Sequence, residues 1–101
     1  MRPKPIRFEW DKKKNDRNVV KHGFGFEIAE EFFLSEVLEK VDERKNYGEK
    51  RIIAIGQLKG LTITLIYTIR KDIYRIISVR RGRKDEEKRY FEWLKAQTFK
   101  D

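Results

Sequence analysis

The stretch from Leu61 to Arg81 constrains the fold of this chain more than any other, because β-branched and aromatic residues dominate it. Only Lys71-Asp72 interrupts the run. The stretch therefore predicts two strands, Leu61–Arg70 and Ile73–Arg80, joined by a two-residue hairpin loop. We expect this hairpin to form both the centre of the core and the working surface of the protein.

A regular two-residue loop also predicts how the two strands pair. The predicted pairs are Arg70–Ile73, Thr68–Arg75, Tyr67–Ile76, Ile66–Ile77, Leu65–Ser78 and Thr64–Val79. Five arginines lie on the hairpin or just after it, namely Arg70, Arg75, Arg80, Arg81 and Arg83. A strand that only had to stay soluble would need scattered charges of both signs.

The length of 101 residues predicts a single domain, residues 1–101, with one sheet and a few helices. Charged residues make up 42% of the chain, but seven Phe, four Tyr and two Trp fall in periodic segments, so a folded protein is expected. The formal charge of +8 favours a polyanionic partner.

The chain has no cysteine and one histidine, which argues against a zinc site or any other metal site and suits a reducing cytosol. No cofactor is expected. The N-terminus lacks the apolar core of a signal peptide, and no run is long enough to span a membrane, so we expect a cytoplasmic protein.

The other segments predict helices before the hairpin and after it. Asp11 is a plausible N-cap and Gly23 a plausible C-terminal stop for a helix over Lys12–His22. The further predicted elements are a helix over Gly25–Leu34, strands over Glu36–Asp42 and Arg51–Gln57, and a helix over Lys84–Gln97. Short connections favour antiparallel neighbours, which gives an α+β fold with two N-terminal helices, a four-stranded twisted antiparallel sheet and a C-terminal helix. Alternation in Ile6–Trp10 suggests an additional short edge strand.

The arginines suggest phosphate binding, since guanidinium groups pair with phosphate oxygens through two hydrogen bonds. The alternative is a solvated strand end balanced by nearby acids. As an exposed strand-end residue, Arg80 is expected to contribute little to stability. Glu49 beside Arg51 could be a simple salt bridge, and Tyr90 could stack on a base or lie in the core.

His22 has two possible roles. Its ordinary pKa suits proton transfer near neutral pH, and Lys21 lies beside it. A histidine in the last turn of a helix before a glycine is also a common helix cap. Spacing alone favours the cap.

A series of motifs in this order resembles the BrnT toxin family of type II toxin–antitoxin systems. The matching features are Phe8, Trp10-Asp11, Lys14, Asn18, Lys21-His22-Gly23, Phe26, Ala29, Gly48-Glu49, Arg51, Tyr67-Thr68, Arg70, Arg75 to Arg80, Glu86 and Tyr90. The resemblance implies a fold similar to RelE-type ribonucleases and RNA cleavage without a metal ion. It also implies inhibition of translation and growth, and neutralisation by a BrnA-type antitoxin in a two-to-two complex that binds operator DNA through the antitoxin.

With the resemblance, proton transfer and helix capping become equally favoured as roles of His22. The resemblance also suggests the site residues. Candidate catalytic residues are His22, Arg75, Arg80, Lys21, Glu49 and Tyr90. Candidate RNA-binding residues are Lys14, Arg51, Arg70, Ser78, Arg81 and Arg83. The main alternative function is a non-catalytic RNA-binding module that uses the same basic face. A DNA-binding transcription factor or a pure interaction protein fits the sequence less well.

Overall fold

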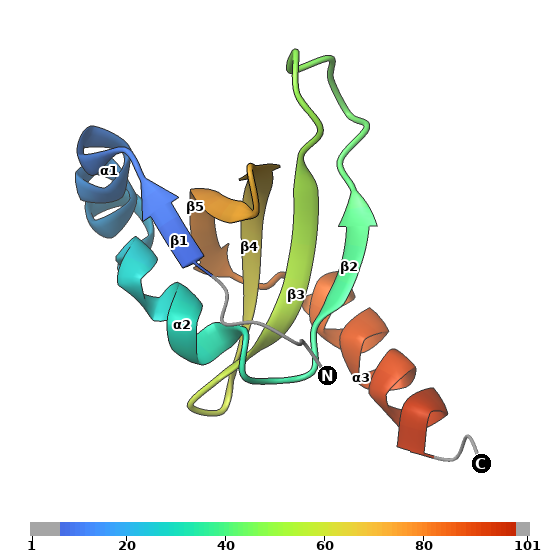
Figure 1. Ribbon diagram of the computed structural model, residues 1–101. Coiled ribbons are helices and arrows are strands. Elements are labelled where there is room, and N and C mark those ends of the chain that lie inside the picture. Colours follow the sequence, from blue (N-terminus) through green and yellow to red (C-terminus); the bar gives the residue numbers. More distant parts are fainter. Residues whose placement is uncertain (1–6, 99–101) are drawn as a thin grey trace.

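The computed structural model describes residues 7–98 as a five-stranded mixed sheet with helices on both faces (Figure 1). The strand order is β1-β5-β4-β3-β2. The elements are β1 (Arg7–Trp10), α1 (Lys12–His22), the 3-10 helix η1 (Phe26–Ile28), α2 (Ala29–Phe32), β2 (Leu38–Val41), β3 (Ile52–Leu58), β4 (Leu61–Arg70), β5 (Ile73–Arg81) and α3 (Lys84–Thr98). No helix within the described residues is both long and apolar enough to cross a membrane.

The expected four-stranded antiparallel sheet is wrong in one respect. β2 to β5 are antiparallel as predicted, and the edge strand expected over Ile6–Trp10 is present as β1 at Arg7–Trp10, with Ile6 outside the described residues. β1 lies parallel to β5, with Arg7 opposite Ile73, so the sheet is mixed. Parallel neighbours need a long connection. Here α1, α2, β2, β3 and β4 together supply that connection.

Local signals determine the ends of α1 and the tight hairpin between β4 and β5. Asp11 caps α1 by accepting a hydrogen bond from the Lys14 amide, and Gly23 ends the helix at φ 81°. Lys71 and Asp72 both have positive φ, 49° and 69°, as a type I′ hairpin loop requires. The predicted second helix is shorter than expected, because Gly25 provides no side-chain cap and the segment begins as the 3-10 turn η1.

The core lies between one face of the sheet and the η1–α2 segment. Phe26, Phe32 and Phe33 are buried against alternate residues of the central strands, among them Leu65 and Tyr67. The opposite face receives the start of α3, where the Thr64 hydroxyl donates a hydrogen bond to Glu86. Successive side chains of a strand point to opposite faces, so α2 and α3 cover opposite sides of the sheet.

A β-bulge in β5 changes the predicted register. Tyr67 pairs with Ile76 as expected, but Ile66 pairs with Ser78 and Thr64 with Arg80, so Ile77 is an extra residue. The predicted pairs Ile66–Ile77, Leu65–Ser78 and Thr64–Val79 are therefore wrong. The physical reason is burial: the bulge turns the fully buried Val79 toward the core, where regular alternation would have placed Ser78 and Arg80.

The bulge has a consequence for function. In an unbroken strand Arg75 and Arg80 would point to opposite faces, since they are five residues apart. With one extra residue between them, both lie on the face that carries Thr64 and Thr68. We call this face, defined by Thr64, Thr68, Arg75, Ser78 and Arg80, the arginine face.

Candidate functional site

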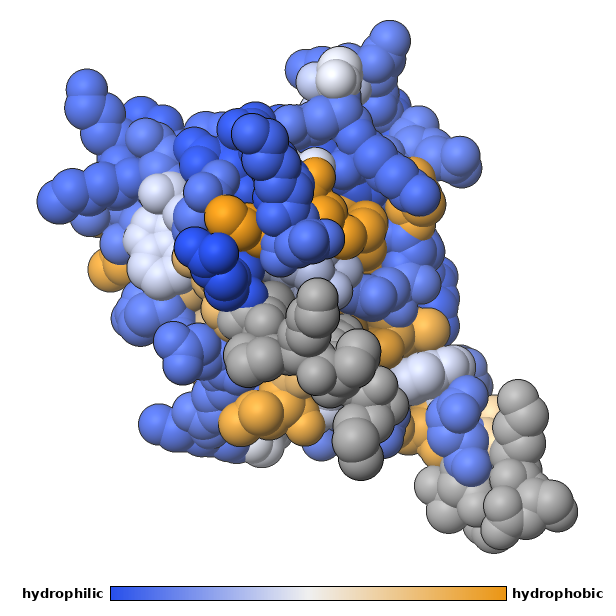
Figure 2. Space-filling model, viewed as in Figure 1, coloured by the Kyte–Doolittle hydropathy of each residue, from blue (hydrophilic) through white to orange (hydrophobic). Residues whose placement is uncertain are grey.

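An open pocket of about 290 Å³ lies where α1 passes the β5 bulge. Its size is close to the lower end of ligand sites, roughly 300 Å³. The residues around it are Lys14, Arg17, Asn18, Lys21, His22, Ile77 and Ser78. Figure 2 shows hydrophilic residues across α1 on the side of the molecule seen there. The pocket joins three cationic side chains, one imidazole and one hydroxyl.

Helical spacing brings the cationic side chains together. Lys14, Arg17 and Lys21 are three and four residues apart along α1, so they lie on one side of the helix. Ser78 and Ile77 form the β5 side of the pocket because of the bulge. The arrangement concentrates positive charge above a strand, which favours a phosphate group in the pocket.

Asn18 fixes α1 against the edge of β5. Its Nδ2 donates hydrogen bonds to the carbonyl oxygens of Val79 at 2.7 Å and Phe24 at 2.8 Å, and its Oδ1 accepts one from the Val79 amide at 3.2 Å. β1 pairs with β5 only as far as Ile76. Beyond that point the Asn18 amide satisfies the backbone of the strand edge, as the next residue of a pairing strand would.

The environment of His22 favours the neutral imidazole. Partial burial, Lys21 and Arg80 all lower the pKa of His22 below its ordinary value of 6.5. A neutral ring gains little from the negative end of the helix dipole, which stabilises cations. The Gly23 amide already closes the last turn by donating to the Val19 carbonyl oxygen. A cap that acts through a positive charge on His22 is therefore less favoured than the sequence suggested.

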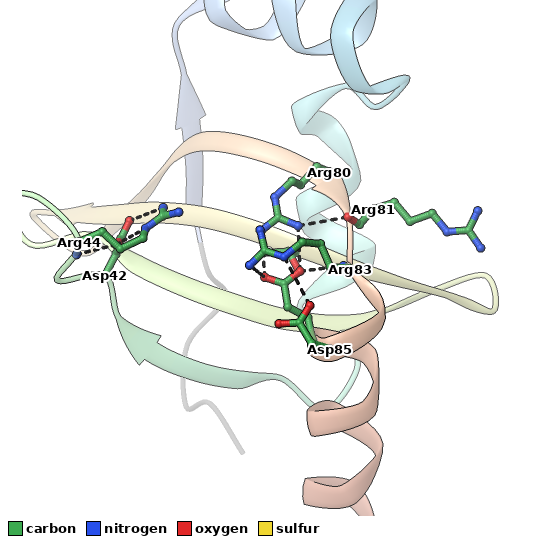
Figure 3. Close-up of polar contacts among 8 residues, drawn as sticks. Asp42, Arg44, Arg80, Arg81, Arg83 and Asp85 are labelled. Atoms are coloured by element: carbon green, nitrogen blue, oxygen red, sulfur yellow. Dashed lines mark hydrogen bonds and ion pairs between the residues drawn. The ribbon is translucent and has the colours of Figure 1, made fainter.

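Arg80 is not the exposed strand-end residue that the sequence predicted. Its side chain is only 20% exposed, and Nη1 and Nη2 donate to the two carboxylate oxygens of Glu86 at 2.8 and 2.9 Å. Figure 3 shows Arg80 together with Arg81, Arg83 and Asp85 at the start of α3. The expectation that Arg80 is exposed is therefore wrong, and its removal would take two hydrogen bonds from a buried carboxylate, which favours a larger contribution to stability than the sequence predicted.

Glu86 is held on several sides. Burial raises the pKa of its carboxyl group, but hydrogen bonds from Arg80, the Arg83 amide and the Thr64 hydroxyl outweigh this and hold the pKa at about 2. Glu86 is therefore an anion at any physiological pH. It links β4, β5 and the first turn of α3.

Arg75 lies on the arginine face, three residues before Ser78 along β5. Its Nη1 donates to Glu9 of the neighbouring strand β1 at 2.9 Å, and 30% of its side chain is exposed. Arg75 is therefore partly exposed beside β1 and does not line the pocket.

Glu49, Arg51 and Arg70 form a separate cluster near the loop between β4 and β5. Glu49 accepts hydrogen bonds from Arg51 and Arg70 at 3.3 and 3.2 Å, and the Arg51 guanidinium lies 4.1 Å from the centre of the Tyr47 ring. On β4, Arg70 is four residues from the Ile66 that pairs with Ser78, or about 13 Å along the strand. The structure does not bring this cluster into the pocket.

The remaining predicted site residues lie at the start of α3 or under it. Arg81 is exposed, and Arg83 makes ion pairs with Asp85 and Glu86. Tyr90 is 1% exposed, and its hydroxyl donates to the Glu36 carbonyl oxygen at 2.7 Å. This contact joins α3 to the segment before β2, which makes Tyr90 a packing residue outside the pocket.

The sequence predictions assigned no site role to Arg17, Asn18, Ile77 or Glu86. Arg17 could have been found from its spacing to Lys14 and Lys21. Asn18 and Glu86 were among the features that carry the family resemblance, but their contacts could not be predicted, because these depend on the bulge or on side chains from other elements. The sequence carries no comparable signal for Ile77. Within residues 7–98, no group of three or more His, Asp or Glu side chains is arranged to hold a metal ion.

Comparison with protein families gives a match over residues 10–86 to the family described as ribonuclease toxin, BrnT, of type II toxin–antitoxin system. No curated protein matches the chain. The matched range includes all of α1 and the central hairpin and ends at Glu86, so it contains every residue of the pocket. The chain belongs to the BrnT family of ribonuclease toxins of type II toxin–antitoxin systems.

Proposed function

We propose that this toxin is an endoribonuclease that cleaves RNA without a metal ion, and that the pocket between α1 and β5 is its active site. The observation that carries the proposal is the gathering of Lys14, Arg17 and Lys21 around Ser78 beside His22, whose pKa is lowered by partial burial, Lys21 and Arg80. The pocket thus offers both charge stabilisation and a proton acceptor from its own side chains.

The proposed reaction uses the 2′-hydroxyl of the RNA as the nucleophile. Neutral His22 accepts the hydroxyl proton while O2′ forms a bond to the adjacent phosphorus and the bond from phosphorus to the 5′-oxygen breaks. The leaving oxygen takes a proton from water, which gives a 2′,3′-cyclic phosphate and a 5′-hydroxyl end. Arg80 stabilises the negative charge that develops on the phosphate, and Lys14, Arg17, Lys21 and Arg75 position the strand.

Incubation of purified protein with single-stranded RNA in excess EDTA tests this proposal. We expect cleavage at an undiminished rate and products that end in a cyclic phosphate. Loss of all cleavage on chelation, recovered by adding back a divalent cation, would contradict the mechanism. The competing RNA-binding module predicts a gel-mobility shift of intact RNA with no products at any incubation time.

We further propose that the protein acts in the cytoplasm, where RNA cleavage inhibits translation and growth, and that a BrnA-type antitoxin neutralises it in a two-to-two complex. The positive pocket suggests how: an acidic segment of the antitoxin covers α1 and the arginine face and excludes RNA. Toxin and antitoxin should then dissociate more easily as salt rises, and RNA and antitoxin should compete for the protein. A ternary complex with intact RNA in the pocket would contradict inhibition by occlusion.

A further inference from the structure

The guanidinium group of Arg80 uses only part of its hydrogen-bonding capacity. Nη1 and Nη2 each donate to Glu86, and Nη1 also donates to the Arg81 carbonyl oxygen at 3.2 Å. A guanidinium carries five N–H bonds in one plane. The two left over are on Nε and Nη2, which lie side by side on one edge. Among the residues that the structure describes, none accepts a hydrogen bond from that edge.

Glu86 holds this guanidinium in a defined orientation. The carboxylate is itself 5% exposed and accepts further hydrogen bonds from the Thr64 hydroxyl at 3.0 Å and the Arg83 amide at 2.8 Å. A carboxylate fixed from two other segments cannot follow the arginine if the arginine moves. The two parallel bonds to it therefore fix the plane of the guanidinium and the direction of its second edge.

The fixed guanidinium borders the pocket. Arg80 follows Ser78 by two residues on the same face, and its charge contributes to the lowered pKa of His22. The neighbouring residue Glu87 also lies in the first turn of α3, but its exposure and its hydrogen-bond partner differ from those of Glu86. Glu87 is exposed and accepts a hydrogen bond from Thr62 at 3.2 Å, and no arginine among residues 7–98 pairs with it.

We propose that Glu86 is a positioning residue, which clamps the terminal nitrogens of Arg80 so that the Nε–Nη2 edge offers two parallel donors to the scissile phosphate of RNA. The inference rests on the proposed function of the pocket and deepens it. Two donors at fixed spacing match two oxygens of a phosphodiester. Because the arrangement exists before RNA binds, little reorganisation is needed when charge develops in the transition state.

An NMR experiment tests the clamp without relying on activity. The Nε–H resonance of Arg80 is assigned in the wild-type protein and is titrated with inorganic phosphate and with a dinucleotide that has a 2′-deoxy sugar and cannot be cleaved. We expect this resonance to shift in the wild type and in Glu87→Gln. In Glu86→Gln the shift should be absent or at least several-fold smaller at the same phosphate concentration.

Kinetics provide the second measurement. Glu86→Gln should lower kcat on the order of 10²-fold with little change in KM, since a misplaced donor affects the transition state most. Glu87→Gln removes the same charge one residue away and should retain wild-type kcat. Arg80→Lys keeps the ion pair with Glu86, and hence the fold, but a single ammonium has no second edge. The Arg80→Lys variant should therefore show a decrease in kcat as large as that of Glu86→Gln.

The outcomes separate this inference from the proposed function. Wild-type kcat in a folded Glu86→Gln or Arg80→Lys protein would overturn the clamp while leaving the ribonuclease proposal intact. An equal phosphate shift of Arg80 Nε–H in the wild type and in Glu86→Gln would overturn it as well. A wild-type protein that never cleaves RNA, yet shows the Glu86-dependent phosphate shift, would support the clamp and contradict the ribonuclease proposal.

Discussion

The side chain of Asn18 pairs with both backbone groups of Val79, donating to its carbonyl oxygen at 2.7 Å and accepting from its amide at 3.2 Å. This pair fixes the helix that carries Lys14, Lys21 and His22 beside the strand that carries Ser78. Asn15, one turn earlier, makes a simpler contact: its Oδ1 accepts from the Phe26 amide at 2.7 Å. The difference between the two asparagines leads to the first prediction.

Asn18→Asp should destabilise the protein, whereas Asn15→Asp should not. A carboxylate can replace the acceptor of Asn15, but at position 18 it cannot donate to the carbonyl oxygens of Val79 and Phe24. We expect Asn18→Asp to lower the free energy of unfolding by roughly 2–4 kcal/mol, as for buried polar groups left without partners. Urea denaturation of the two variants provides the measurement, and equal midpoints would contradict this role of Asn18.

The second prediction concerns acid stability. The pKa of Glu86 falls from its ordinary value of 4.5 to about 2 in the folded protein, so the unfolded chain takes up the proton first as pH decreases. The contribution of Glu86 is fully present above pH 4.5 and is lost as pH falls toward 2, and it amounts to roughly 3 kcal/mol. In Glu86→Gln the dependence of unfolding free energy on pH should be shallower in this window.

Asp42 complicates that measurement and also supplies its control. Hydrogen bonds from Arg44 lower the pKa of Asp42 to about 2, so this residue contributes to the same loss of stability in acid. Asp42→Asn should remove the part of the pH dependence of unfolding free energy that Asp42 contributes. The part contributed by Glu86 should remain. A Glu86→Gln curve parallel to the wild-type curve between pH 4.5 and 2 would show that the Arg80–Glu86 pair is not coupled to folding.

The third prediction concerns the role of His22. If neutral His22 accepts the proton of the 2′-hydroxyl, kcat should fall as pH decreases through the pKa of this residue, which lies below 6.5. His22→Gln should remove this acid limb and lower kcat by roughly 10²–10⁴-fold. Thermal unfolding should remain close to that of the wild type. A lower unfolding temperature combined with an unchanged pH profile would instead indicate a helix cap.

The fourth prediction compares two adjacent lysines of α1. Lys14 lines the pocket and Lys13 does not, although both are exposed on the same helix. Lys14→Ala should weaken binding of a non-cleavable RNA and reduce the salt dependence of its logarithmic binding constant by about 0.7, the value for one phosphate contact on a single strand. Lys13→Ala should change this slope much less. Equal slopes for the two variants would place RNA elsewhere.

Local chemistry by itself determined several parts of this structure. The α1 boundaries follow from Asp11 and Gly23, the position of the main hairpin follows from Lys71-Asp72, and the face shared by Lys14 and Lys21 follows from helical spacing. Each of these depends on residues a few positions apart, so the sequence contains all the information that they need.

The register of β5 and the partners of its side chains depend instead on contacts between distant segments. The bulge at Ile77 exists because burying Val79 is more favourable than burying Ser78 or Arg80, and that comparison requires the α2 residues that pack against the sheet. The parallel pairing of β1 and the contact of Asn18 with Val79 likewise join segments that the sequence does not relate. The sequence suggested that nearby acids balance the arginines, but only packing of α3 on the sheet buries Glu86 and pairs it with Arg80. Local propensities predict where strands lie, whereas long-range packing determines which side chains they present to RNA.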